Sequence, residues 1–173
     1  MTPDIELLRD SLDELEDQVD YLELELVDTP DWAEPSDTSY LTDEDRSDPE
    51  TMDNVDAMQQ TNRLIAWFGR DMEGFVGLWR GPDDTPLESA PVVRLDTEGQ
   101  YAVVARTIGD YIAISVDEDD FDAAREALID AGFEVSKSSA DIWQSIEDLD
   151  DPNEFRGKLY NAGRVRRGLD PIE

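Results

Sequence analysis

Four short apolar runs follow one another between residues 64 and 105, and their spacing constrains the fold more than any other feature. The runs are LIAWFG (64–69), GFVGLW (74–79), PVVRL (91–95) and YAVVA (101–105). Polar or glycine-containing links separate them, at residues 70–73, 81–86 and 96–99. Runs of this length bounded by turn residues predict strands. We therefore expect four strands in an antiparallel meander.

The stretch EGFVGLWRGP (73–82) holds three glycines and could also be a phosphate-binding loop. Such loops either open a helix directly after a strand or end in Gly-Lys-Ser/Thr. This stretch does neither, because it ends in Gly-Pro and its glycines are interleaved with large apolar residues. Glycine inside a strand is typical of a bulge or of a close backbone approach. The stretch is therefore interpreted as a strand.

Helical patterns lie on both sides of these runs. They cover residues 53–61, 107–116, 119–132 and 139–149, and a partly helical segment follows Pro152. The run FEV (133–135) predicts a further short strand. Strands grouped together, followed by grouped helices, are typical of the α+β class. We expect residues 52–173 to form a single α+β domain, with an antiparallel or mixed sheet of about four to six strands flanked by helices.

Residues 1–27 predict one acidic amphipathic helix, with Thr2 as N-cap and Pro3 in the first turn. Spacings of three and four residues predict one apolar stripe, made of Ile5, Leu8, Leu12, Leu15, Val19, Leu22 and Leu26. The stripe fits either a coiled-coil seam in a homodimer or a helix lying on its own domain. The second interpretation is favoured, because a dimer seam would join two strongly acidic helices. We expect a monomer, with the homodimer as the alternative.

Residues 28–51 predict an acidic, proline-rich loop, tethered to the core by Trp32, Tyr40 and Leu41. The acids at 41–50 and 117–122 lack the alternating spacing and central glycine of a calcium-binding loop. No metal site is predicted in either segment. We expect the helix, the loop and the α+β region to form one domain overall.

The chain carries 45 acidic and 14 basic residues, for a formal net charge of −31. Residues 1–60 alone hold 21 acidic and 2 basic residues, a net charge of −19. This charge disfavours nucleic acid as a direct ligand and an anionic membrane as a surface. No apolar run is long enough to span a membrane, and no signal-peptide pattern is present, so a cytoplasmic location is expected. The basic tail, with Arg164, Arg166 and Arg167, is expected to fold back on the acidic body.

The sequence has no cysteine and no histidine. It therefore lacks Cys-His and Ser-His-Asp nucleophile systems and thiolate zinc sites. Paired carboxylates could serve an enzyme, but with 45 acidic residues such pairs occur everywhere by chance. We predict no catalytic, cofactor-binding or metal-binding residue and do not expect an enzyme.

The runs IAWFGRDMEGFVGLWRGP and PVVRLDTEGQYAVVARTIGDYIAI resemble the central sheet of the SUKH superfamily. The resemblance covers about residues 41–116 and consists of a strand ending near Phe-Gly, an aromatic near Trp79, the PVV-L-x-x-EG strand and turn, and a helix entry such as TIGDYIAI. The family's N-terminal Leu-Pro, aromatic and Asn-Gly-Gly pattern is absent. The resemblance implies a non-catalytic binding protein, most often an immunity protein that neutralises a toxin domain, frequently a nuclease.

A strongly acidic inhibitor suits a basic partner, whose association it would accelerate. The expected contact surface comprises Trp32, Glu34, Asp37, Tyr40, Asp43, Glu44, Asp45, Trp79, Asp83 and Asp84. Each of the three aromatic residues could instead lie in the core. For any one of them considered alone, we favour the core over the contact surface. In the alternative, the protein is a regulatory or scaffold domain of the same fold. Its acidity, with 28 Asp and 17 Glu against two Lys, would then be an adaptation to high salt.

Overall fold

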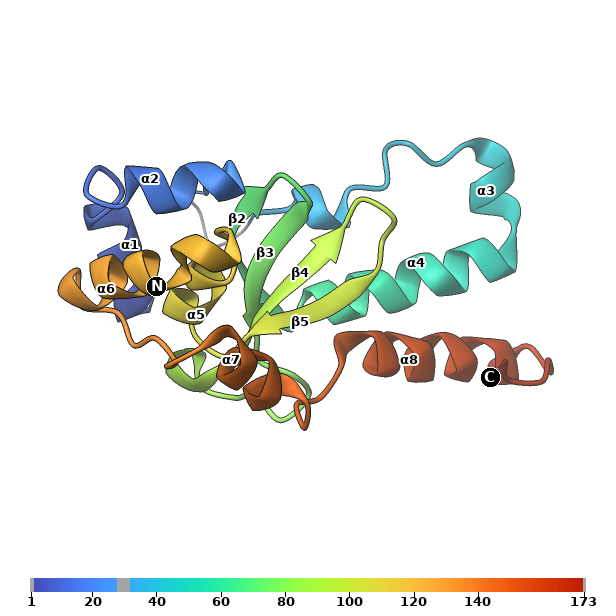
Figure 1. Ribbon diagram of the computed structural model, residues 1–173. Helices are drawn as coiled ribbons and strands as arrows, with labels where there is room; N and C mark the ends of the chain where they lie inside the picture. Colours follow the sequence, from blue (N-terminus) through green and yellow to red (C-terminus); the bar gives the residue numbers. More distant parts are fainter. Residues whose placement is uncertain (1, 28–31, 173) are drawn as a thin grey trace.

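A computed structural model describes residues 2–27 and 32–172, and these form an α+β fold around one antiparallel sheet (Figure 1). The sheet has five strands in the order β1-β2-β3-β4-β5. Their bounds are β1 Glu25–Leu26, β2 Ile65–Asp71, β3 Gly74–Trp79, β4 Val92–Asp96 and β5 Tyr101–Ala105. The predicted four-strand meander is confirmed as β2 to β5. The N-terminal segment adds β1 at the edge beside β2.

Eight α-helices lie in the described residues. They are α1 Pro3–Asp10, α2 Glu16–Val19, α3 Asp43–Ser47, α4 Pro49–Asn62, α5 Ile108–Ala113, α6 Phe121–Asp130, α7 Ser139–Ile146 and α8 Pro152–Arg166. The last four, α5 to α8, confirm the helical segments predicted after the sheet. Single 3-10 turns are η1 Asp20–Leu22, η2 Glu34–Ser36, η3 Leu87–Ser89 and η4 Glu118–Asp120. None of the helices in this part of the chain is long and apolar enough to cross a membrane.

Strand alternation divides the apolar side chains between the two faces of the sheet. In β4, Val92 belongs to the cluster on the first face, while Val93 and Leu95 belong to the cluster on the second. The first cluster is completed by side chains from α1, α2, α5, α6 and α7. Met58 of α4 and Phe155 of α8 pack against the second. The sheet is thus the middle layer between two sets of helices.

The prediction of one continuous helix over residues 1–27 is wrong. The chain forms α1, a turn at 11–15, α2, η1 and then β1, so Leu26 lies in a strand. A straight helix over residues 3–26 would be about 36 Å long, whereas a seven-residue strand spans only about 23 Å. The break allows both halves of the apolar stripe to pack on the same short sheet. Repulsion between closely spaced acids on this segment also weakens an extended helix.

The apolar stripe of the N-terminal segment is covered within the chain. Its core members Ile5, Leu8, Leu15, Val19 and Leu22 are all buried in the first cluster. The segment therefore lies on its own domain, as favoured from the sequence. It offers no exposed coiled-coil seam.

The segment predicted as loop 28–51 contains more regular structure than expected. Residues 28–31 lie outside the described residues, but η2, α3 and the start of α4 fall within 32–51. The Thr42 hydroxyl and the Asp45 carboxylate form a capping box at α3, and Asp48 caps α4. The polar residues Thr42, Asp45 and Asp48, which predicted a loop, are therefore the caps of two helices. The prediction that Tyr40 tethers this segment to the core is wrong, because its side chain is 67% exposed.

The predicted strand at residues 133–135 does not form. Instead of a neighbouring strand, side chains of α5 and its N-cap satisfy this backbone. The Thr107 hydroxyl donates to the Glu134 carbonyl at 3.1 Å, and the Ser136 N–H donates to the buried Asp110 carboxylate at 2.7 Å. A β-carbon on Gly109 would lie 2.5 Å from the Glu134 carbonyl oxygen, so glycine permits this close contact.

Gly74 and Gly77 of the 73–82 stretch lie in β3 and allow tight strand packing, as predicted. A β-carbon on Gly74 would lie 2.1 Å from the carbonyl oxygen of Leu95 on β4. On Gly77 it would lie 2.4 Å from the Ile65 side chain on β2. The stretch is therefore a structural strand and not a ligand-binding loop.

Helices α4 and α8 lie side by side and extend beyond the sheet as an arm, with α3 at its far end (Figure 1). Two ion pairs join their outer halves, Arg164 with Glu50 and Arg167 with Asp53 at 2.6 Å. These two arginines of the basic tail therefore fold back on acidic residues, as expected from the sequence. A β-carbon on Gly163 would lie 2.6 Å from the Asp53 carboxylate carbon.

The close contact at Gly163 predicts opposite effects for two alanine substitutions in α8. Gly157→Ala meets no atom within 4 Å and should stabilise the protein by up to about 1 kcal/mol through helix propensity. Gly163→Ala should be less stable than Gly157→Ala by about 1 kcal/mol, because Asp53 must move away from Arg167. Urea unfolding of both variants measures this. In an Asp53→Ala background the difference should vanish; a difference that persists would contradict the contact.

Candidate functional site

One half of the first sheet face is left uncovered by helices and carries a groove. The helices on this face pack over Val76, Leu78 and Val92, whereas Ala102 farther along the same face is exposed. Between the β2–β3 turn and the β4–β5 turn, three adjoining hollows run across this region toward α6 and α7. We call them together the open-face groove.

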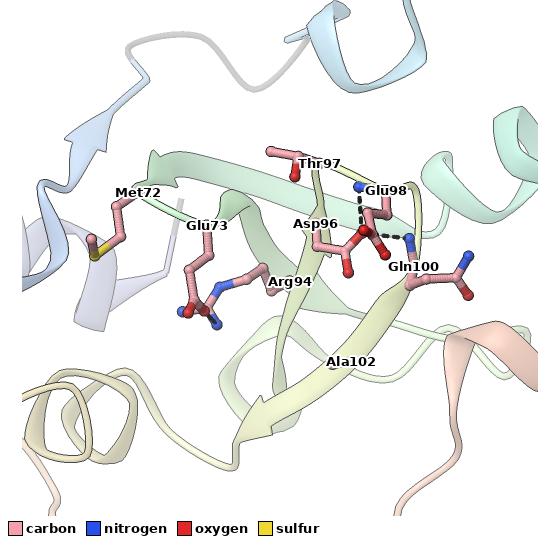
Figure 2. A pocket seen from close by; sticks show the side chains of 8 residues that line it. All are labelled: Met72, Glu73, Arg94, Asp96, Thr97, Glu98, Gln100 and Ala102. Atoms are coloured by element: carbon pink, nitrogen blue, oxygen red, sulfur yellow. Dashed lines mark hydrogen bonds and ion pairs between the residues drawn. The ribbon is translucent and has the colours of Figure 1, made fainter.

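The three hollows of the open-face groove share walls. The first has a volume of about 480 Å³ and is shown in Figure 2; it is lined by Met72, Glu73, Arg94, Asp96, Thr97, Glu98, Gln100 and Ala102. The second, of about 250 Å³, is lined by Tyr21, Leu22, Met72, Glu73, Arg94, Val104, Tyr111, Ile114, Ser115 and Trp143. The third, of about 310 Å³, is lined by Ile114, Val116, Glu118, Phe121, Ser139 and Trp143.

The floor of the groove is organised by the Asp71 carboxylate, whose side chain is fully buried. One carboxylate oxygen accepts the backbone N–H groups of Glu73 and Gly74 at 2.9 and 2.8 Å, which fixes the β2–β3 turn. The other oxygen accepts Arg94 Nε at 2.8 Å and the Tyr111 hydroxyl at 2.7 Å. A buried charge is tolerated when it is paired and its lone pairs are satisfied, and both conditions hold here.

Arg94 projects from β4 toward the groove and is held by carboxylates on two sides. Its guanidinium pairs with Asp71 at 2.6 Å and with Glu73, and it lies 6.0 Å from the centre of the Tyr111 ring. Figure 2 shows the Glu73 and Arg94 side chains end to end. Burial alone lowers the pKa of Arg94, but the charges of Asp71 and Glu73 raise it above its ordinary value. The Arg94 side chain is therefore held in place, and its positive charge is neutralised by the two carboxylates.

Burial raises the pKa of the Tyr111 hydroxyl well above its ordinary value, and the adjacent Asp71 charge adds to this shift. Tyr111 therefore stays protonated and donates to Asp71. A neutral phenol, a paired arginine and a saturated carboxylate leave no group free to move a proton. The cluster is suited to holding the shape of the groove rather than to acid–base chemistry.

Three large apolar side chains from separate segments are exposed around the second hollow. Tyr21 of η1 is 47% exposed, Met72 of the β2–β3 turn 64%, and Trp143 of α7 54%. The Asp120 carboxylate, with smaller effects from burial and from Asp117, raises the pKa of the Tyr21 hydroxyl. Apolar side chains gathered in this way and rimmed by charge are typical of an interaction surface.

The residues predicted as a partner surface do not come together. Trp79 is buried and Trp32 is half-buried, and both pack in the second-face cluster on Phe155 and Phe75. Burial of Trp79 contradicts its assignment to a contact surface, and Trp32 packs against the same cluster while remaining partly exposed. The physical reason is that each aromatic ring fills the space between the sheet and its neighbouring segments.

The predicted acidic contacts lie at separate places on the molecule. Glu34 in η2 faces Arg70 of β2, and Asp37 binds the Ser39 backbone. The acids of α3, Asp43, Glu44 and Asp45, lie at the end of the arm (Figure 1). Tyr40 precedes α3 in the chain and is exposed. Asp83 and Asp84 are exposed in the turn after β3, and Asp84 pairs with Arg80. None of these residues lines the open-face groove.

Sequence reasoning missed the residues of the groove, although β4 carries a signal. Arg94 shares its strand face with Val92, so an arginine falls where alternation expects a core residue. A charged residue on a core face predicts a buried partner or an uncovered end of the sheet. Tyr21, Met72 and Trp143 carried no comparable signal.

The described residues contain no group of three or more acidic side chains arranged to hold a metal ion. Comparison of the chain with protein-family models, with curated proteins and with solved structures gives no match. The resemblance to the SUKH superfamily therefore stays a prediction.

Removal of the Asp71 charge should destabilise the fold far more than removal of the neighbouring Glu73 charge. Asp71→Asn removes the fully buried counter-charge of the half-buried Arg94 guanidinium and should lower the free energy of unfolding by about 3 kcal/mol. Glu73→Gln, at a side chain 61% exposed, should change it by less than about 1 kcal/mol. Urea unfolding compares the two. Equal losses would show that Asp71 does not organise the site.

Alkaline pH should destabilise the protein through its buried tyrosines. Burial raises the pKa of Tyr101 and of Tyr111. Their stabilising contribution is therefore complete below about pH 10, where unfolded tyrosines start to ionise, and is lost as the pH rises further. In Tyr111→Phe, the slope of the free energy of unfolding above pH 10 should be shallower by about 1.4 kcal/mol per pH unit. Denaturant unfolding at several alkaline pH values measures the slope, and the exposed Tyr40→Phe is the control.

Proposed function

We propose that the protein is a non-catalytic binding protein that holds a basic partner protein in the open-face groove, and that it acts as an immunity protein against a toxin domain. The observation that carries the proposal is the convergence of Tyr21, Met72 and Trp143, all exposed, on one hollow. Aromatic and methionine side chains are enriched at the centres of protein interfaces, where they supply most of the binding energy.

The charge around the groove supports a cationic partner. Glu73 and Glu98 lie at one end, and Glu118 with its neighbours Asp117 and Asp120 lies at the other. The positive charge nearest the groove centre, Arg94, is already neutralised by Asp71 and Glu73. An acidic rim around an apolar centre accelerates encounter with a basic protein and disfavours acidic competitors.

The immunity role rests on the resemblance to the SUKH superfamily. Within that resemblance, a basic nuclease-type toxin domain is the expected partner. A long-range field from a net charge of −31 would attract such a domain before any contact forms.

The alternative keeps the fold and gives the acidity another purpose. Acids lie on the arm and the N-terminal segment as well as at the groove. A regulatory or scaffold domain kept soluble in concentrated salt would have such a distribution. In that case stability should rise steeply up to molar salt and no specific basic partner should exist.

Affinity capture with groove variants separates these possibilities. Tagged wild-type protein, a Met72→Ser/Trp143→Ala double variant and a Tyr40→Ala control would be incubated with native lysate, and bound proteins identified by mass spectrometry. We expect one basic protein that is retained by the wild type and the control and lost from the double variant, because only the double variant lacks the groove side chains.

The captured protein would then be produced in cells with and without this chain. Protection of growth by the wild type, but not by the double variant, is the expected result for an immunity protein. Retention of the same protein by all three baits would contradict the groove as binding site. Absence of any specific partner at low and at high salt would overturn the proposal in favour of the salt-adapted scaffold.

A further inference from the structure

The three hollows of the open-face groove adjoin one another, with the second between the first and the third. The first and second share the walls Met72, Glu73 and Arg94, and the second and third share Ile114 and Trp143. A single side chain would fill one hollow and leave two empty. A series of adjoining hollows instead suits several side chains that follow one another along one chain segment.

The hollows differ in chemistry along the series. Carboxylates of Glu73, Asp96 and Glu98 line the first, in which the arginine is already paired. The second is walled by the exposed side chains of Tyr21, Met72 and Trp143, with the polar side chains of Glu73, Arg94 and Ser115 beside them. The third is lined by the apolar side chains of Ile114, Val116, Phe121 and Trp143 and by the polar side chains of Glu118 and Ser139. The series therefore favours a cationic side chain, then an aromatic one, then an aliphatic one.

The edge of the sheet next to the groove is closed to an added strand at the Tyr101 end. The Asn153 side chain accepts from the Tyr101 N–H at 3.0 Å and donates to the Tyr101 carbonyl. Arg156 donates to the Gly99 carbonyl at 2.6 Å. A segment bound beside this end thus has to be recognised by its side chains across the face of the sheet, and not by backbone pairing with Tyr101.

We propose that the open-face groove binds an extended segment of its basic partner, with a lysine or arginine in the first hollow and aromatic and aliphatic side chains in the second and third. This inference rests on the proposed function and specifies its ligand. In an extended chain, alternate residues point to the same side. The three anchoring side chains should therefore occupy every second position of the segment.

The test uses defined peptides and the full-length protein. The probe is the capped peptide GKSFSLG, together with GLSFSKG for the opposite chain direction; the control peptide GKFLSSG has the same composition with the three side chains consecutive. Binding is followed by two-dimensional amide NMR at about 20 mM and about 500 mM salt, conditions that differ strongly in screening. We expect shifts at Met72, Ala102 and the Trp143 indole from one alternating peptide, and about tenfold weaker binding of the consecutive peptide.

Variants of the protein show which peptide side chain occupies which hollow. Trp143→Ala should weaken the alternating peptide about tenfold, while Tyr40→Ala should leave it unchanged; both side chains are exposed, so the fold should tolerate either change. Glu98→Gln should weaken binding of the alternating peptide that binds, GKSFSLG or GLSFSKG. It should not change binding of the same peptide with Gln in place of Lys. This double-mutant cycle isolates the pairing of the cation with the first hollow.

Failure of the inference differs from failure of the proposed function. If neither alternating peptide shifts the groove residues, or if the consecutive peptide binds equally well, the extended-segment inference is overturned. The proposed function would still stand if lysate capture depended on Trp143. Conversely, peptides that bind as expected, without any captured basic protein, would support the groove's specificity and remove the immunity role.

Discussion

The buried carboxylate of Asp71 is the interaction on which the arrangement of this protein's open sheet face depends. It joins the turn between β2 and β3, the guanidinium of Arg94 on β4 and the hydroxyl of Tyr111 on α5. Three segments that are distant in sequence therefore meet at one charge. Because an unsatisfied buried carboxylate is costly, this network favours one geometry of turn, strand and helix over alternatives.

The same network leaves part of the sheet free of helical cover. Arg94 occupies a position where an apolar side chain would have extended the first-face cluster, and Ala102 beside it on β5 is exposed. Antiparallel sheets tolerate such one-sided exposure. The uncovered half provides the floor of the open-face groove, and Tyr21, Met72 and Trp143 provide its apolar walls.

The acidic excess has different structural roles in different places. Asp45 and Asp48 cap helices, Asp71 and Asp110 are buried in hydrogen-bond networks, and the acids of α4 pair with arginines of α8. Net charge alone therefore says little about where a partner binds. What distinguishes the groove is the combination of carboxylates with exposed apolar side chains, since either feature alone is common on protein surfaces.

The sequence by itself determined the strands β2 to β5, the helices after them and the α+β class, because these depend on local periodicity and turn residues. The stripe from Ile5 to Leu22 predicted burial correctly, but not the break at residues 11–15, which depends on the length of the sheet beneath it. Likewise, residues 133–135 have a strand-like pattern, but Thr107 binds the Glu134 carbonyl and Asp110 binds the N–H of the following Ser136 in place of a neighbouring strand. The groove was decided only by tertiary structure. Its walls come from η1, a turn and α7, and no local pattern brings such distant segments together.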